Sequence, residues 1–170
     1  MSKQLTHLDE SGQAKMVNVG HKPDTERLAV ARGTVYMQPQ TLQLIAEGNL
    51  KKGDVLTVAQ LAGVMAAKRT SDLIPLCHPL PLTHIDVTCH LNQAESCVEI
   101  EAAVRLTGKT GVEMEALTAV AIAGLTIYDM AKAVDRSMRL SDVRLIRKAG
   151  GQSGDWRLEA DTLISTRDES

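Results

Sequence analysis

The sequence predicts an α+β domain in which helices cover one face of an antiparallel sheet, and three features lead to this prediction. Two stretches, His84–Leu91 and Cys97–Leu106, alternate apolar and polar residues as half-buried strands do. A short connection, Asn92–Ser96, joins them as a hairpin. An almost uncharged run, Ala116–Tyr128, follows, and a helix that is apolar nearly all round must be buried on more than one side.

Length and composition narrow the class of protein. The chain has 170 residues, which suits one domain, and a formal net charge of -2, which gives no basic surface for nucleic acid. Phe is absent and only three aromatic residues are present, too few to stack on single-stranded nucleic acid. The three cysteines lack C-x-x-C spacing, so we expect free thiols in a reducing compartment.

No membrane segment is predicted. The N-terminal residues contain no apolar signal region. The apolar run of the long helix is too short, and too often interrupted by threonine, to span a bilayer. We therefore expect a cytoplasmic protein that contacts neither membrane nor nucleic acid.

The first half of the chain alternates turn signals with short elements. Residues 1–15 are polar and predicted to be flexible, and Met16–Val19 is a candidate short strand. Glu26–Met37 has apolar residues on both faces, which predicts a strand covered on both sides. Pro39 opens a short helix that continues to Glu47, where Gly48 stops it.

The next elements complete the order. Asp54 is a candidate N-cap for a helix over Val55–Lys68. Ser71–Leu82 contains three prolines and is predicted to be stiff and irregular. After the hairpin and the long helix, Asp142–Lys148 is the last predicted strand, and Gly150–Gly154 is a predicted flexible loop. A flexible tail is predicted over residues 159–170, which leaves one domain over residues 16–158.

The predicted order is β-α-α-β-β-α-β. Removing the extra helix leaves β-α-β-β-α-β, the split βαβ pattern of ferredoxin-like folds. The sheet of such a fold is antiparallel with its helices on one face, so the other face is free to meet a partner. We expect a small domain with such an apolar helix to associate with itself.

Charged residues stand at both ends of the long helix. Glu113 and Glu115 lie at its start, and Asp129 and Lys132 lie one turn apart at its end. Glu near the N-terminus and Lys near the C-terminus also suit the helix macrodipole, which is the simpler explanation. Fourteen residues separate Glu115 from Asp129, about 21 Å at roughly 1.5 Å per residue. One small substrate cannot easily reach both ends, so either there are two functions or the site is built between subunits.

Two other kinds of site are not favoured by the residue pattern. The stretch G-K-T-G lacks the earlier glycine of a nucleotide-binding phosphate loop, because Ala103 occupies that position. Metal binding needs converging ligands, but strand alternation points Cys89 away from His84 and His90. We expect a packed Cys89 thiol, solvated imidazoles and no resident metal. The cations Lys52, Lys68, Arg69, Lys109, Lys132 and Lys148 are scattered surface charges unless the fold brings them together.

Five stretches carry long and chemically unusual motifs: K-K-G-D-V at Lys51–Val55, A-A-K-R-T-S-D-L-I-P-L-C-H-P-L at Ala66–Leu80, R-L-T-G-K-T-G-V-E-M-E-A-L-T-A at Arg105–Ala119, L-T-I-Y-D-M-A-K-A-V at Leu125–Val134 and K-A-G-G-Q-S-G-D at Lys148–Asp155. Together they resemble the cyclic pyranopterin monophosphate synthase family, also called the molybdenum cofactor biosynthesis protein C family. The resemblance covers roughly Leu5 to Glu159.

The resemblance implies the second step of molybdenum cofactor synthesis. In that step (8S)-3',8-cyclo-7,8-dihydroguanosine 5'-triphosphate becomes cyclic pyranopterin monophosphate, a lyase reaction that releases diphosphate. It also implies a ferredoxin-like protomer in a homohexamer, a trimer of dimers with its sites at the dimer interface. No cofactor is implied, although Mg²⁺ can accompany the substrate triphosphate.

The family's site residues fall on positions that carry matching residue types. The implied catalytic residues are Asp129, Lys132 and Lys52. The implied substrate-binding residues are Leu76, Cys77, His78, Glu113, Met114, Glu115, Lys68, Arg69 and Lys148. We expect Lys132, supported by Asp129, to transfer protons and the cations to stabilise the departing diphosphate. The alternative is a non-catalytic ferredoxin-like module that binds a nucleotide or a protein, in which Asp129, Lys132 and Lys52 would be dispersed.

Overall fold

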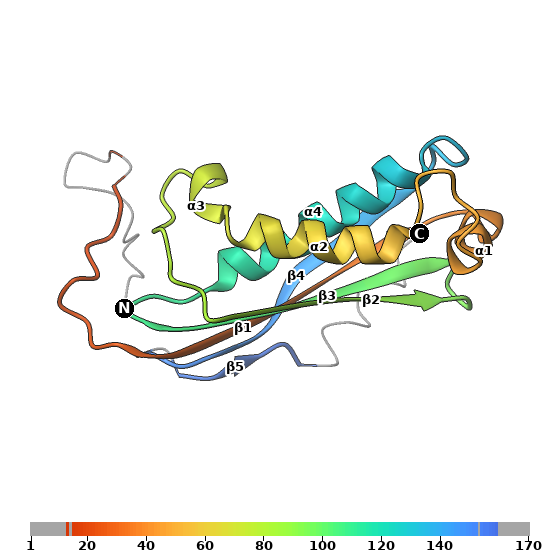
Figure 1. Cartoon of the computed structure of the whole chain (residues 1–170). Coiled ribbons are helices and arrows are strands. Elements are labelled where there is room, and N and C mark those ends of the chain that lie inside the picture. Colours follow the sequence, from red (N-terminus) through yellow and green to blue (C-terminus); the bar gives the residue numbers. More distant parts are fainter. Residues whose placement is uncertain (1–12, 14, 153, 160–170) are drawn as a thin grey trace.

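The computed structural model describes residues 13, 15–152 and 154–159 and has two layers, a sheet and a helical layer (Figure 1). The strands are β1 (Thr25–Tyr36), β2 (His84–Asn92), β3 (Cys97–Gly108), β4 (Arg139–Ala149) and β5 (Trp156–Arg157). They form one antiparallel sheet in the order β2-β3-β1-β4-β5. The first four strands have the split βαβ order, so the predicted α+β ferredoxin-like class is confirmed.

The predicted hairpin, β2 and β3, lies at one edge of this sheet. Its alternating residues match the buried and the open face of the sheet. Val87 pairs with Ala102 and Cys89 with Ile100, and all four side chains are buried. The intervening residues of both strands are half-buried or exposed, and His90 and Glu99 are among the exposed ones. The apolar face of the hairpin thus joins the core, as the period of two predicts.

The helices are α1 (Pro39–Ala46), α2 (Val55–Ala67), α3 (Thr70–Leu73) and α4 (Glu113–Ala131). The predicted N-cap of α2 is confirmed, because the Asp54 side chain accepts a hydrogen bond from the Thr57 N–H at 3.1 Å. Helices α2 and α4 lie side by side on one face of the sheet (Figure 1). They run antiparallel, since Lys52 just before α2 reaches Asp129 near the end of α4.

Helix α4 is the centre of the core. Ala119, Val120, Ala123 and Ile127 are fully buried between the sheet and α2. By length and composition alone α4 is apolar enough to cross a membrane, with a mean hydropathy of 1.3, but half of it is buried inside the fold. In this structure it is a core helix, as its all-round apolar sequence predicts.

Several predicted elements and boundaries are wrong. Met16–Val19 is not a strand in the structure. The segment predicted as irregular contains α3, and β5 was not predicted. Strand β4 begins at Arg139, three residues before the predicted start, because Asp142 adopts a left-handed φ of 57° beside a register shift against β1. Such a bulge hides the alternation of a strand. The predicted terminal segments 1–15 and 159–170 lie largely outside the described residues.

The face of the sheet away from the helices is open and polar. Arg32 and Glu101 form an ion pair on it at 2.7 Å. A hollow of about 1160 Å³ lies on this face, and a smaller one of about 410 Å³ lies at the start of β1. None of the twelve predicted site residues lines either hollow.

Candidate active site

The three residues predicted to be catalytic meet at the C-terminal end of α4. The Asp129 carboxylate accepts a hydrogen bond from Lys132 Nζ on Oδ1 and another from Lys52 Nζ on Oδ2, both at 2.7 Å. Lys52 also donates to the backbone carbonyl oxygen of Asp129 at 2.8 Å. Lys132 is one turn beyond Asp129 on the same helix, whereas Lys52 comes from the loop between α1 and α2. We call these three residues the lysine–aspartate cluster.

The charges of this cluster stabilise one another. The hydrogen bonds from Lys132 and then Lys52 lower the pKa of Asp129 from 3.8 to about 2. The hydrogen bond to Asp129 raises the pKa of Lys132 above its usual 10.5. Burial would tune a lysine toward a base by lowering its pKa, but Lys132 is exposed and shifts the other way. In a single protomer Lys132 is therefore an ammonium group, suited to donate a proton or to bind an anion.

A second cluster forms at the N-terminal end of α4. Lys148 Nζ, from the end of β4, lies 3.2 Å from Glu113 Oε1. The neighbouring Glu115 is 4% exposed, and burial raises its pKa, with a further contribution from the charge of Glu113. Burial also raises the pKa of the Cys77 thiol, and the charge of Glu115 adds to it. We call Glu113, Glu115, Cys77 and Lys148 the glutamate cluster.

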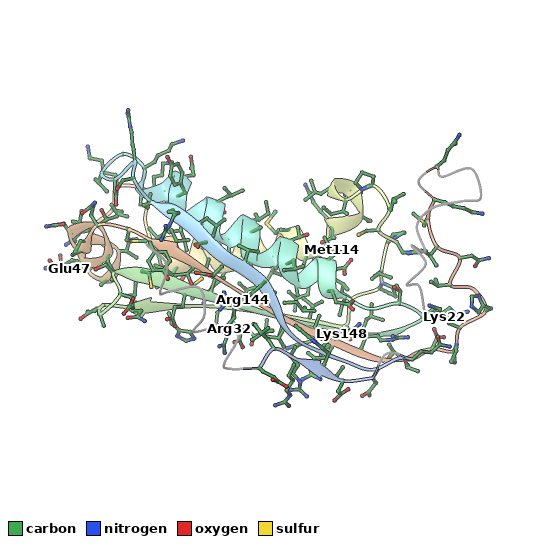
Figure 2. All side chains as sticks on the ribbon, turned by 180° about the vertical axis from the view of Figure 1, so that it is seen from behind. Lys22, Arg32, Glu47, Met114, Arg144 and Lys148 are labelled. Atoms are coloured by element: carbon green, nitrogen blue, oxygen red, sulfur yellow. The ribbon has the colours of Figure 1, made fainter. Side chains whose placement is uncertain are left out.

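The other predicted residues lie at the same end but make fewer contacts. Leu76 and His78 flank Cys77 and are half-buried, and Met114 is 37% exposed at the start of α4. Lys68 and Arg69 follow α2, whose antiparallel course brings its end to the start of α4. Within the described part of the chain, neither cation has an ion-pair partner, which leaves both free for an anion. In Figure 2 Met114 and Lys148 lie in the half of the molecule opposite to Glu47, which follows α1.

Sequence reasoning missed Arg27, which organises the turns beside the glutamate cluster. Its guanidinium donates to the carbonyl oxygens of Gly108 and Lys109 before α4 and of Gly150 after β4, at 3.3 to 3.5 Å. Gly151 has a φ of +77°, and a Cβ there would collide with the Arg27 guanidinium. The adjacent glycines in K-A-G-G were the available signal, because such pairs allow close backbone approach.

The predicted cationic set is divided rather than gathered into one patch. Lys52 and Lys132 belong to the lysine–aspartate cluster, and Lys148 belongs to the glutamate cluster. Lys109 joins neither, since its ammonium donates to the Gly20 carbonyl oxygen at 2.7 Å. The two ends of α4 therefore carry separate groups of charges.

The predicted environments of the Cys89 thiol and of the His84 and His90 imidazoles are confirmed. Cys89 is buried, and burial raises the pKa of its thiol to about 11, while His84 and His90 are exposed. Among the described residues there is no group of three His, Cys, Asp or Glu side chains placed to hold a metal ion. Carboxylates, ammonium groups and the Cys77 thiol are the reactive side chains that the structure brings together at the two ends of α4.

Fold and site together define an α+β protein of the ferredoxin-like type with charged groups at both ends of a buried helix. Ammonium groups held on a carboxylate, with free cations at the opposite end, suit a polyanionic small molecule.

Comparison with known proteins gives the family. The model of the MoaC family matches residues 16–151, and the chain belongs to this family. A relative from Thermomicrobium roseum is 63% identical over 96% of this chain and 99% of its own length. Relatives from a Roseiflexus species and from Brucella ovis are 65% and 57% identical over 89% and 96% of this chain, and over 96% and 99% of their own lengths. All three bear the name cyclic pyranopterin monophosphate synthase.

Proposed function

We propose that this protein is an enzyme of molybdenum cofactor biosynthesis that converts (8S)-3',8-cyclo-7,8-dihydroguanosine 5'-triphosphate to cyclic pyranopterin monophosphate and diphosphate. Its relatives over nearly the full chain bear the name of that synthase. The structural observation that supports the proposal best is the meeting of Lys52 and Lys132 on one carboxylate. Lys52 comes from the loop before α2, whereas Asp129 and Lys132 belong to the end of α4, so the fold assembles this cluster from separate elements.

The reaction needs the two capacities that the clusters offer. Opening the imidazole ring and building the pyrazine ring require proton transfers, for which Lys132 held by Asp129 is the candidate. Cyclisation requires an oxygen to attack the α-phosphorus and expel diphosphate. Lys52 is a candidate to stabilise the charge that develops there. Lys68 and Arg69, which have no ion-pair partner among the described residues, are further candidates. Glu113 and Glu115 are candidates to accept hydrogen bonds from the guanine edge.

The alternative, a non-catalytic ferredoxin-like module, predicts that Asp129, Lys132 and Lys52 are dispersed. Lys52 and Lys132 each lie 2.7 Å from the Asp129 carboxylate in one protomer, so the three are not dispersed, which favours the enzyme. The direct test is to incubate the purified protein with the cyclic triphosphate and measure diphosphate and the pterin product. A folded protein that binds this substrate but releases no diphosphate would support the alternative.

We further propose that the complete site forms between two copies of the chain. The two clusters lie at opposite ends of α4, about 21 Å apart at roughly 1.5 Å per residue. A two-fold axis across the middle of this helix brings the lysine–aspartate cluster of one copy to the glutamate cluster of the other. Because the interface is symmetric, both composite sites form at once.

The surface of the helical layer supports such an interface. Helix α2 exposes Val58, Leu61 and Met65 at helical spacing, and α4 exposes Leu125, with exposed fractions of 41 to 60%. Apolar side chains at this spacing on adjacent helices are typical of a surface that another subunit covers. We propose the dimer as the unit of a homohexamer, a trimer of dimers.

Complementation between two variants tests the composite site. Asp129→Asn and Glu113→Gln each inactivate one cluster, so each variant alone should have little activity. Co-expression at equal levels gives mixed dimers, in which one site carries both changes and the other carries none. About one quarter of all sites should then be intact. If each protomer holds a complete site, every site carries one change and no activity returns.

We propose a cytoplasmic enzyme with no resident cofactor. Mg²⁺ would enter with the triphosphate as part of the substrate, and turnover measured with and without a chelator tests that expectation.

A further inference from the structure

A buried carboxylate outside both clusters ties two parts of the chain together. Asp135 is 5% exposed and lies in the connection between α4 and β4. Its Oδ2 accepts hydrogen bonds from the Gln38 N–H at 2.9 Å and from the Thr41 hydroxyl at 3.2 Å. Its Oδ1 accepts from the N–H and the hydroxyl of Ser137 at 2.9 and 2.7 Å. Both oxygens are therefore satisfied, as a buried charge requires.

These bonds fix the start of α1 to the end of α4. Gln38 is the N-cap residue of α1, and its side chain makes no capping bond; the distant Asp135 accepts instead from the backbone N–H of Gln38, as the N3 carboxylate of a capping box does. A negative charge at a helix N-terminus is favourable. Burial raises the pKa of Asp135, but hydrogen bonds from Gln38, Ser137 and Thr41 outweigh it and the net shift is downward. Asp135 is thus an ionised carboxylate that links two elements almost a hundred residues apart in the chain. We call this link between Asp135 and the start of α1 the Asp135 brace.

The brace closes a ring of contacts that includes the lysine–aspartate cluster. Asp135 contacts the start of α1, and α1 leads into the loop before α2, which carries Lys52. Lys52 Nζ then contacts Asp129 on α4, six residues before Asp135. Lys52 is exposed, and both of its hydrogen bonds go to Asp129, so its place depends on where α1 lies relative to α4.

We propose that Asp135 is a positioning residue for the reaction, which holds α1 against the end of α4 so that Lys52 reaches Asp129. The inference rests on the proposed function only in that Lys52 serves the reaction. A displacement of about 1 Å at a reacting group can reduce the rate on the order of a hundredfold, so an indirect contact of this kind is measurable. In Asp135→Asn the side-chain amide has only one accepting oxygen. Either the donors on Gln38 and Thr41 or those on Ser137 therefore lose their acceptor.

The first test follows Lys52 without relying on turnover. The full-length protein is treated with limiting acetic anhydride, and acetylation of Lys52 and of the exposed neighbour Lys51 is measured by mass spectrometry. We expect Lys52 to react more slowly than Lys51 in the wild type, and the two rates to converge in Asp135→Asn. Asp142→Asn removes an exposed carboxylate that pairs with Arg144 and is the matched control, expected to leave the ratio unchanged. An unchanged ratio in folded Asp135→Asn would overturn the proposal.

The second test is a double-mutant cycle on kcat. We expect Asp135→Asn to lower kcat by on the order of tenfold to a hundredfold in the wild type, and to have almost no further effect in Lys52→Ala. Equal losses in both backgrounds would show a general structural effect and contradict the proposal. If Asp135→Asn does not fold, Thr41→Val removes one of the two bonds to α1 and enters the same cycle. A wild type without turnover would refute the proposed function. The acetylation test would then still decide whether Asp135 positions Lys52.

Discussion

Replacing Asp129 by asparagine is the sharpest test of the lysine–aspartate cluster. The carboxylate accepts two hydrogen bonds of 2.7 Å, one on each oxygen, from ammonium groups. An asparagine has one accepting oxygen, and its amide group would face the other ammonium, so at least one lysine must move. Loss of a positioned acid or base reduces rates by about 10² to 10⁴, and we expect kcat to fall within this range. Lys52 keeps the backbone carbonyl of residue 129, so KM should change much less.

The pH dependence follows from the same contacts. Because the folded-state pKa of Asp129 is about 2, only about 1% of this carboxyl is protonated at pH 4, against about 40% at its usual 3.8. The ion pairs therefore stabilise the folded state above pH 4, and that contribution is lost as the pH falls toward 2. We expect no acid limb from Asp129 in a pH–rate profile measured between pH 5 and 9, since Asp129 stays ionised throughout this range.

The assay is diphosphate release over a range of substrate concentrations, with circular dichroism to confirm folding. Asp142→Asn is the control, because it makes the same chemical change at an exposed ion pair outside both clusters. A folded Asp129→Asn protein with wild-type kcat would refute the role given to this cluster.

Three further predictions concern the glutamate cluster, its supporting loop and the core. Burial and then the charge of Glu115 raise the pKa of the Cys77 thiol, so Glu115→Gln removes the second cause and should speed alkylation of Cys77 by iodoacetamide at pH 8. An unchanged rate would contradict their proximity. Gly151→Ala should cost about 1–3 kcal/mol in urea unfolding and more than Gly154→Ala, which shares the positive φ but meets open space; equal costs would mean that Arg27 yields freely. Ile100→Ala should destabilise by about 2–5 kcal/mol with kcat at 25 °C unchanged, since it empties a buried site under the helices; a loss below 1 kcal/mol would contradict close packing there.

Local patterns in the sequence were enough to predict most of the fold. The alternation in β2 and β3, the cap at Asp54 and the apolar run of α4 each depend on residues within one element, and the structure confirms them. The start of β4 could not be predicted, because a bulge at Asp142 interrupts its alternation. Strand β5 has two residues, too few for any period. Met16–Val19 has a suitable composition, but a strand also needs a neighbour, which no local pattern shows.

The site was predictable where its residues are close in sequence or carry a family motif. The pairing of Asp129 with Lys132 follows from helical spacing, whereas the arrival of Lys52 requires the antiparallel packing of α2 on α4. The contact of Asp135 with the start of α1 left no local signal, since Gln38 and Thr41 lie more than ninety residues away. The direction of the Lys132 pKa shift also had to come from the structure, because it depends on exposure.

The second bond of Lys52 has a practical consequence. Its acceptor is a main-chain carbonyl oxygen at the end of α4, which no side-chain substitution at position 129 removes. Asp129→Asn should therefore still bind the substrate but turn it over slowly. Lys52 stays in place to bind the anion, whereas Lys132 loses its partner. Such a variant would serve as a trap in which the uncleaved triphosphate stays bound long enough to be seen in a crystal.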